Sequence, residues 1–204
     1  MDFALLASVA GFAFASCGTP GPNNMLLAHS ATRFGYGPTL KLLLGIMLGL
    51  QLLLLFTALG LGQLFLHWPI LQWALKMLGT GYLLWLAWQI GTATPPDADA
   101  DADSKTMRAV SMNWRQGAVF QVFNPKAWLM AVSAISGFTL AGEQYWPSAW
   151  LVLTVFLAFG LLTGHLWAFF GLTLRTWLRS ARDWRRFNQG MALLTAASVV
   201  MIWY

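Results

Sequence analysis

Long apolar stretches joined by short polar connections dominate this chain of 204 residues. Residues 42–66 and 149–173 are each longer than the roughly 20 apolar residues that cross a bilayer as a helix. The sequence lacks the strand-like alternation of apolar and polar residues that a membrane barrel requires. The pattern therefore predicts an all-α membrane protein.

Hydropathy and helix-breaking residues divide the chain into six predicted transmembrane helices. They cover residues 3–33, 38–66, 69–91, 114–140, 147–174 and 186–204. Within this single transmembrane domain, three helices (1–91) precede the long polar linker (92–113) and three (114–204) follow it. An odd number of helices in each half reverses the second half in the membrane, so we expect a 3+3 inverted repeat.

Prolines interrupt the first and the fourth predicted helix. The two runs are Cys17-Gly18-Thr19-Pro20-Gly21-Pro22-Asn23-Asn24 and Phe123-Asn124-Pro125-Lys126. Lipid offers no partner to a free backbone N–H or C=O, so a helix can break at membrane depth only beside protein or a wet cavity. A matched pair of broken helices in the two halves of a chain indicates the binding site of a transporter.

The basic residues set the expected orientation. Ten of the twelve Lys and Arg residues lie in the first, third and fifth connections, and the other two lie inside predicted spans. The positive-inside rule makes these three connections cytoplasmic, so both termini should face outward. The net charge of +5 therefore reflects the orientation of the helices in the membrane, and a nucleic-acid partner is not expected.

Polar residues gather near the expected midplane. At about 1.5 Å per residue from the cytoplasmic basic residues, Asn23, Gln51, Pro125 and His165 each lie about 15 Å deep. Lys76 lies about 12 Å below the outer face by the same count. The strongly polar residues of the spans include Asn23, Asn24, Gln51, Lys76, Asn124, Lys126 and His165. Groups at this depth usually face a bundle interior or a cavity. Snorkelling of the lysines and simple interhelical hydrogen bonds are the alternatives.

The breaks have a chemistry that suits a zwitterion. Pro20, Pro22 and Pro125 lack N–H donors and crowd carbonyl groups one turn earlier, while Gly21 permits an otherwise strained backbone. The crowded carbonyls are those of Ser16, Gly18 and Gln121. A half-helix that begins near Asn23 exposes N–H groups and a positive dipole end, which suits a carboxylate.

The other half of the expected ligand is an ammonium group. Freed carbonyls and the side-chain oxygens of Asn23, Asn24 and Asn124 suit such a group, and Lys76 or Lys126 would strengthen carboxylate binding. The breaks therefore predict a small amino acid as the ligand.

The motifs resemble those of the lysine exporter (LysE/RhtB) family of bacterial amino-acid exporters, over nearly the whole chain. They are Thr19-Pro20-Gly21-Pro22-Asn23-Asn24, Arg33-Phe34-Gly35, Gly45, Leu78-Gly79-Thr80-Gly81-Tyr82-Leu83 and Asn124-Pro125-Lys126-Ala127. Within the family, Asn23-Asn24, Leu84-Trp85-Leu86-Ala87-Trp88 and Ile202-Trp203-Tyr204 are most similar to exporters of cysteine and O-acetylserine. The resemblance implies a multi-pass inner-membrane protein that exports from cytoplasm to periplasm, driven by the proton gradient, with both termini periplasmic.

The chain departs from an exporter of cationic amino acids in one respect. All seven acidic residues lie at chain ends or in connections, so no carboxylate is available at the midplane to bind a cationic side chain. This favours small neutral substrates of the cysteine, O-acetylserine, threonine and homoserine class. His165 is the natural candidate to carry a coupled proton, because its unperturbed pKa is about 6.5, and a buried lysine is the second candidate.

The runner-up hypothesis is a divalent-metal exporter, which needs clustered carboxylates or histidines. The membrane region offers only His165 and, near the inner end, His29. The linker aspartates at positions 97, 99, 101 and 103 lack the Gly and the distal Glu of a calcium loop. We therefore expect no metal site and no cofactor.

Two other classes are weaker still. A membrane redox carrier would need a cysteine pair, and Cys17 is the single cysteine. An enzyme would need a nucleophile with its base, and Ser133 and Ser136 have no evident base, so no enzymatic activity is expected. Gly45 and Gly49, echoed by Gly160 and Gly164, allow close helix approach, either within the fold or in a homodimer.

Overall fold

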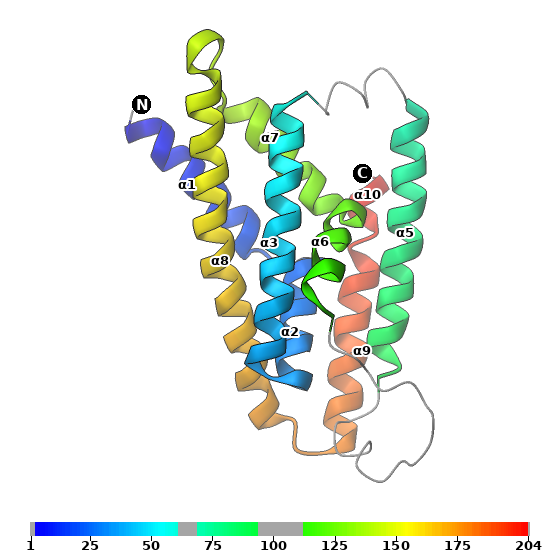
Figure 1. The fold of residues 1–204 in the computed structure, drawn as a ribbon. Coiled ribbons are helices and arrows are strands. Elements are labelled where there is room, and N and C mark those ends of the chain that lie inside the picture. The colour runs from blue at the N-terminus through cyan, green and yellow to red at the C-terminus, as the bar shows by residue number, and fades with distance from the viewer. Residues whose placement is uncertain (1–2, 61–68, 94–111, 204) are drawn as a thin grey trace.

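The computed structural model describes residues 3–60, 69–93 and 112–203, and every regular element in these residues is a helix. The elements are α1 (Phe3–Gly18), α2 (Pro22–Phe34), α3 (Tyr36–Ala58), α5 (Pro69–Gly91), α6 (Trp114–Phe123), α7 (Pro125–Phe138), the 3₁₀ helix η2 (Gly142–Gln144), α8 (Tyr145–Trp177), α9 (Ala181–Ala197) and α10 (Val200–Trp203). Figure 1 shows α3, α5, α8 and α9 along the long axis of the bundle, with α1 and α7 slanting across its upper half.

Both predicted helix breaks are present. The stretch 3–33 forms α1 and α2, which bend by 55° at their junction. The stretch 114–140 forms α6 and α7, which meet at Asn124. Of the helices in the described residues, α3 and the continuous η2–α8 segment are long and apolar enough to cross a membrane. The bent pair α1–α2 makes a third span if it is counted as one.

Glycines set both ends of α3. Gly35 alone separates α2 from α3, at φ +80°, a backbone conformation that glycine adopts without steric cost. Gly60, at φ +99°, follows the last turn of α3. The predicted helix 38–66 therefore ends at Ala58 in the described residues, and residues 61–66 lie outside them.

The sixth predicted helix begins earlier than expected, at Ala181 and not at residue 186. The cause is a capping box: Ser180 Oγ accepts a hydrogen bond from the Asp183 N–H, and the Asp183 side chain accepts one from the Ser180 N–H. This exchange satisfies two backbone donors at the start of α9. The helix is also interrupted after Ala197, which leaves α10 as a separate short turn.

α3 is the central helix and packs against α2, α6, α7 and α8. Its approach to α6 is close because it presents glycines there. A methyl group on Gly45 would overlap the Trp114 carbonyl, and one on Gly49 would lie 2.5 Å from the Ala118 carbonyl oxygen. A methyl group on Gly117 of α6 would likewise lie 2.8 Å from the carbonyl oxygen of Leu42. Glycine therefore lets these two backbones touch.

The echoed glycines of α8 face the same central helix. Gly160 lies under the thioether of Met47, and Gly164 lies under the Leu43 side chain. Both glycine pairs thus serve packing around α3, and Gly45 and Gly49 are covered by α6 within one chain.

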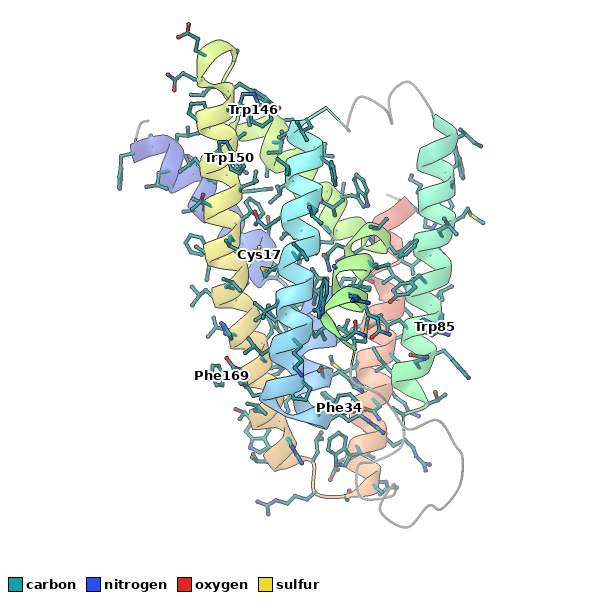
Figure 2. The ribbon with its side chains drawn as sticks, viewed as in Figure 1. Cys17, Phe34, Trp85, Trp146, Trp150 and Phe169 are labelled. Atoms are coloured by element: carbon teal, nitrogen blue, oxygen red, sulfur yellow. The ribbon has the colours of Figure 1, made fainter. Side chains whose placement is uncertain are left out.

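Large apolar side chains cover the outside of the bundle. Trp85, Trp146, Trp150 and Phe169 are each between 43% and 56% exposed and point outward from their helices (Figure 2). Many other large apolar side chains in the described residues are more than a third exposed as well, which is normal where lipid is the solvent. Composition, helix length and surface therefore agree on a membrane protein.

Replacing Gly45 by Ala should destabilise the fold by roughly 1–3 kcal/mol, because the added methyl group would force the α3 and α6 backbones apart. The thermal midpoint of the detergent-purified variant should fall by several degrees. Gly81→Ala is the matched control, because a methyl group there meets no atom within 4 Å. Equal midpoints for the two variants would contradict this account of α3–α6 packing.

Candidate substrate-binding site

The first break occupies residues Thr19 to Gly21. α1 ends at Gly18, and Pro22 is the first residue of α2, where a missing N–H costs no hydrogen bond. Gly21 is the N-cap in an extended conformation, and it has no side chain with which to cap the helix. The amino end of α2 therefore has no side-chain cap, and its N–H groups carry the positive end of the helix dipole.

Side chains from other parts of the chain bind the carbonyls of this break. Asn24 Nδ2 donates to the carbonyl oxygens of Cys17 and Thr19, each at 2.8 Å, and Trp167 Nε1 donates to that of Gly18 at 3.1 Å. The sequence predicted free carbonyls at Ser16 and Gly18 for a substrate ammonium group. The structure differs, because the Gly18 carbonyl is bound by Trp167 and the Ser16 carbonyl oxygen accepts a hydrogen bond from the Thr19 hydroxyl at 3.3 Å. The Asn24 amide uses its nitrogen for both bonds, which leaves its oxygen for a ligand.

The second break is tighter, because a single residue separates its two helices. Pro125 is the first residue of α7, and Asn124 caps that helix by accepting a hydrogen bond from the Lys126 N–H at 3.1 Å. The Asn124 N–H in turn donates to the Gln121 carbonyl oxygen at 3.2 Å. The Gln121 carbonyl is therefore occupied, contrary to expectation. The uncapped amino end belongs to α2 and not to α7.

Three amide side chains join the two breaks. Asn23 and Gln121 exchange a pair of hydrogen bonds, each 3.0 Å long, between their amide groups. Asn124 Nδ2 also donates to Asn23 Oδ1 at 2.8 Å. Gln121 and Asn124 are fully buried. These bonds link residues about 100 positions apart in the chain, so the two breaks meet in space as expected.

Lys126 makes a second link between the breaks. Its Nζ lies 2.8 Å from both the carbonyl oxygen and the hydroxyl of Thr19, and 3.5 Å from the Pro20 carbonyl oxygen. Its side chain crosses directly over Gly21, where a methyl group would lie 2.9 Å from Cδ and 3.1 Å from Nζ. Each of these acceptors is neutral, so the ammonium charge lies beside the amino end of α2 without a carboxylate among these contacts.

A small cavity lies at this junction. It measures about 20 Å³, which is room for roughly one water molecule. Its polar lining consists of Ser16, Asn23, Asn24, Thr163 and Lys126, and its sulfur-containing lining consists of Cys17, Met47 and Met130. The remaining lining is aliphatic or glycine. The cavity therefore has a polar end at the breaks and an apolar end beside α3.

Three predicted site residues lie elsewhere. The Lys76 ammonium is 5.7 Å from the centre of the Trp203 ring, and α5, which carries it, packs on α6, α9 and α10. His165 Nδ1 lies 2.9 Å from the Tyr36 hydroxyl, in a hydrogen bond between α8 and α3. Gln51 Nε2 is buried without a hydrogen-bond partner in the described part of the chain. None of the three lines the cavity at the junction of the breaks.

The sequence prediction missed the Gln121 side chain, which is central to the site. A signal was available, because Gln121 is a polar residue four positions before Pro125 in an otherwise apolar helix. Thr19 and Ser16 were missed as well, since hydroxyl side chains in membrane helices often bond their own backbone.

The broken helices and the polar cavity at their junction define a membrane transporter. A family model described as LysE type translocator matches residues 15–202, and the chain belongs to this family. The cysteine/O-acetylserine efflux protein of Salmonella typhimurium (strain LT2) is 32% identical over 189 residues, covering 91% of each chain. The protein of the same name from Escherichia coli (strain K12) is 31% identical over 188 residues, again covering 91% of each chain. No solved structure matches.

Proposed function

We propose that this chain is a secondary active exporter that carries small neutral amino acids from the cytoplasm to the periplasm. Membership of a translocator family and the names of its relatives support amino-acid efflux. The observation that carries the proposal is the Lys126 ammonium beside the uncapped amino end of α2.

A carboxylate is the ligand that this arrangement favours. The Lys126 ammonium and the dipole end of α2 are both positive, and the bonds that hold Lys126 come from neutral oxygens. Positive charge at membrane depth is costly unless it is paired. A substrate carboxylate would neutralise Lys126 and accept hydrogen bonds from the first N–H groups of α2. Binding would then draw Nζ away from Thr19 and loosen one link between the two breaks.

The substrate ammonium group would bind at the same polar end. The carbonyls of the first break already accept hydrogen bonds from Asn24, Trp167 and Lys126, so the Asn24 side-chain oxygen and the Ser16 hydroxyl are the proposed acceptors. Among the described residues, none of those that line the cavity is an Asp or Glu that would hold a cationic side chain. This composition favours a neutral substrate such as cysteine, O-acetylserine, serine or threonine.

The proposed topology is six spans in a 3+3 inverted repeat, with both termini in the periplasm. The matched breaks support it, because each half of the chain contains one break followed by a proline at the first helical position. We also propose proton coupling, with His165 as the carrier, supported by its hydrogen bond to Tyr36 between α8 and α3.

Transport in inverted membrane vesicles tests this function. Vesicles that contain the protein should accumulate labelled cysteine, serine and threonine when their interior is acidified, and lysine should enter no faster than into vesicles lacking the protein. Dissipating the pH gradient should abolish accumulation. Uptake of cadmium or nickel in place of the amino acids would contradict amino-acid export and favour the metal exporter.

Replacing Gly21 by Ala should weaken substrate binding about tenfold or more, the typical effect of losing a hydrogen bond to a charged group. The backbone at Gly21 is extended (φ −179°), a conformation that any residue adopts, so the added methyl group acts mainly by displacing the flexible Lys126 side chain. Isothermal titration of the purified protein with cysteine measures the effect.

Gly18→Ala is the matched control in the same break. Its methyl group would meet Thr163 Cγ2 at 3.6 Å, an ordinary van der Waals distance, and would not touch Lys126. Wild-type affinity in Gly21→Ala, or a greater loss in Gly18→Ala, would argue against a role for Lys126 in binding.

A further inference from the structure

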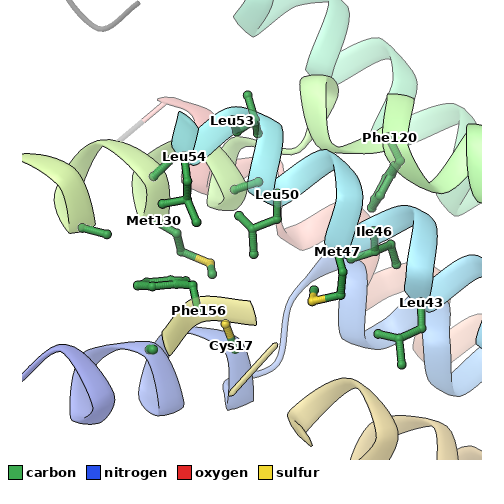
Figure 3. Packing of buried hydrophobic residues seen from close by; sticks show 14 of the residues in the cluster. Cys17, Leu43, Ile46, Met47, Leu50, Leu53, Leu54, Phe120, Met130 and Phe156 are labelled. Atoms are coloured by element: carbon green, nitrogen blue, oxygen red, sulfur yellow. The ribbon is translucent and has the colours of Figure 1, made fainter. Parts of the chain in front are cut away.

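The apolar end of the cavity is where the side chain of a bound amino acid would lie, if the proposed function holds. The polar end would bind the carboxylate and ammonium groups of the substrate. The substrate side chain would then point toward the apolar end. Met47 and Met130 extend from α3 and α7 toward Cys17 at the end of α1 (Figure 3). These three sulfur-containing side chains surround the space into which the substrate side chain would project.

A residue in this region must move to admit a substrate. The cavity has room for roughly one water molecule, which is too little for an amino acid. Leu43, Ile46 and Leu50 are branched and at most 1% exposed, so they are firmly packed. Met47 is 6% exposed and unbranched, and methionine rotates and repacks more readily than branched aliphatic residues.

Gly160 provides the space that the end of Met47 occupies. A methyl group on Gly160 would lie 2.6 Å from Met47 Sδ, 3.1 Å from Met47 Cε and 3.9 Å from Cys17 Sγ. The Met47 thioether therefore rests on the bare backbone of α8, at the level of the first break. Gly164, one turn further along α8, receives Leu43 in the same way, but that contact belongs to the firmly packed region.

We propose that Met47, resting on Gly160, sets the size of the substrate side chain that the site accepts. The unbranched thioether gives way to a side chain that is narrow at its γ position, such as that of cysteine or O-acetylserine, and excludes one that branches at Cγ, such as that of leucine. Met47 is thus a specificity-determining residue, while the residues at the breaks bind the groups that all amino acids share.

A transport panel of serine, cysteine, O-acetylserine, methionine and leucine in inverted vesicles tests the proposal. Met47→Ala should raise the rate for leucine relative to cysteine about tenfold or more, because a single methylene in an apolar pocket changes selectivity by about this factor. Met191→Ala is the matched control, because Met191 is 7% exposed on α9 and does not line the cavity. It should keep the wild-type ratio.

Gly160→Ala should make the cavity smaller, and combining it with Met47→Ala should restore the lost space. Its methyl group should push the Met47 thioether into the cavity and lower transport of O-acetylserine relative to serine. The double variant Met47→Ala/Gly160→Ala should recover O-acetylserine transport, since the colliding Sδ and Cε atoms are gone. Should Met47→Ala fail to fold, as judged by its thermal midpoint, Met47→Val is used with the same expected direction.

The outcomes separate this proposal from the function on which it rests. If the wild-type protein transports none of the amino acids, the proposed function fails. If it transports them but the leucine-to-cysteine ratio of the Met47 variant stays within about twofold of wild type, the size-setting role of Met47 is wrong and the export function stands. Persistence of the Gly160→Ala defect in the double variant would also contradict the role of Met47.

Discussion

The structure depends on how two interrupted helices satisfy their broken backbones inside lipid. A free N–H or C=O costs several kcal/mol in the hydrocarbon region, so each break must find partners within the protein. The α1–α2 break obtains them from Asn24, Trp167 and Lys126, and the α6–α7 break from its own Asn124. Since Lys126 belongs to α7 and Asn23 bonds to Gln121, satisfying one break also fixes its position against the other.

This arrangement leaves positive charge at the first break without a carboxylate partner, and that charge indicates what kind of ligand the site binds. The uncapped amino end of α2 and the Lys126 ammonium place positive charge beside a cavity whose lining contains no carboxylate side chain. The glycine-mediated packing of α3 against α6 and α8 holds the surrounding helices in place. Rigidly packed helices around the Lys126 ammonium, which has no carboxylate partner in the cavity lining, are the arrangement expected of a site that binds an anionic group of its substrate.

Local features were predictable from the sequence, and contacts across the bundle were not. Both breaks lie where the prolines predicted, because the loss of an N–H donor is a local property of proline. Depth counting placed Lys76 near midplane but gave no information on the direction in which α5 faces, and its ammonium lies over Trp203. The Gly18 carbonyl was expected to be free, because no local pattern shows that Trp167, 149 positions further along the chain, would bind it.

The most direct measurement compares two lysines by isothermal titration of the purified protein with cysteine and with cysteine methyl ester. The wild-type protein should bind the acid and not the ester, which lacks the carboxylate charge. Lys126→Met should weaken binding of the acid about tenfold or more, and Lys76→Met should leave it unchanged. Wild-type affinity in Lys126→Met, or equal binding of acid and ester, would contradict the claim that the joined breaks hold a carboxylate.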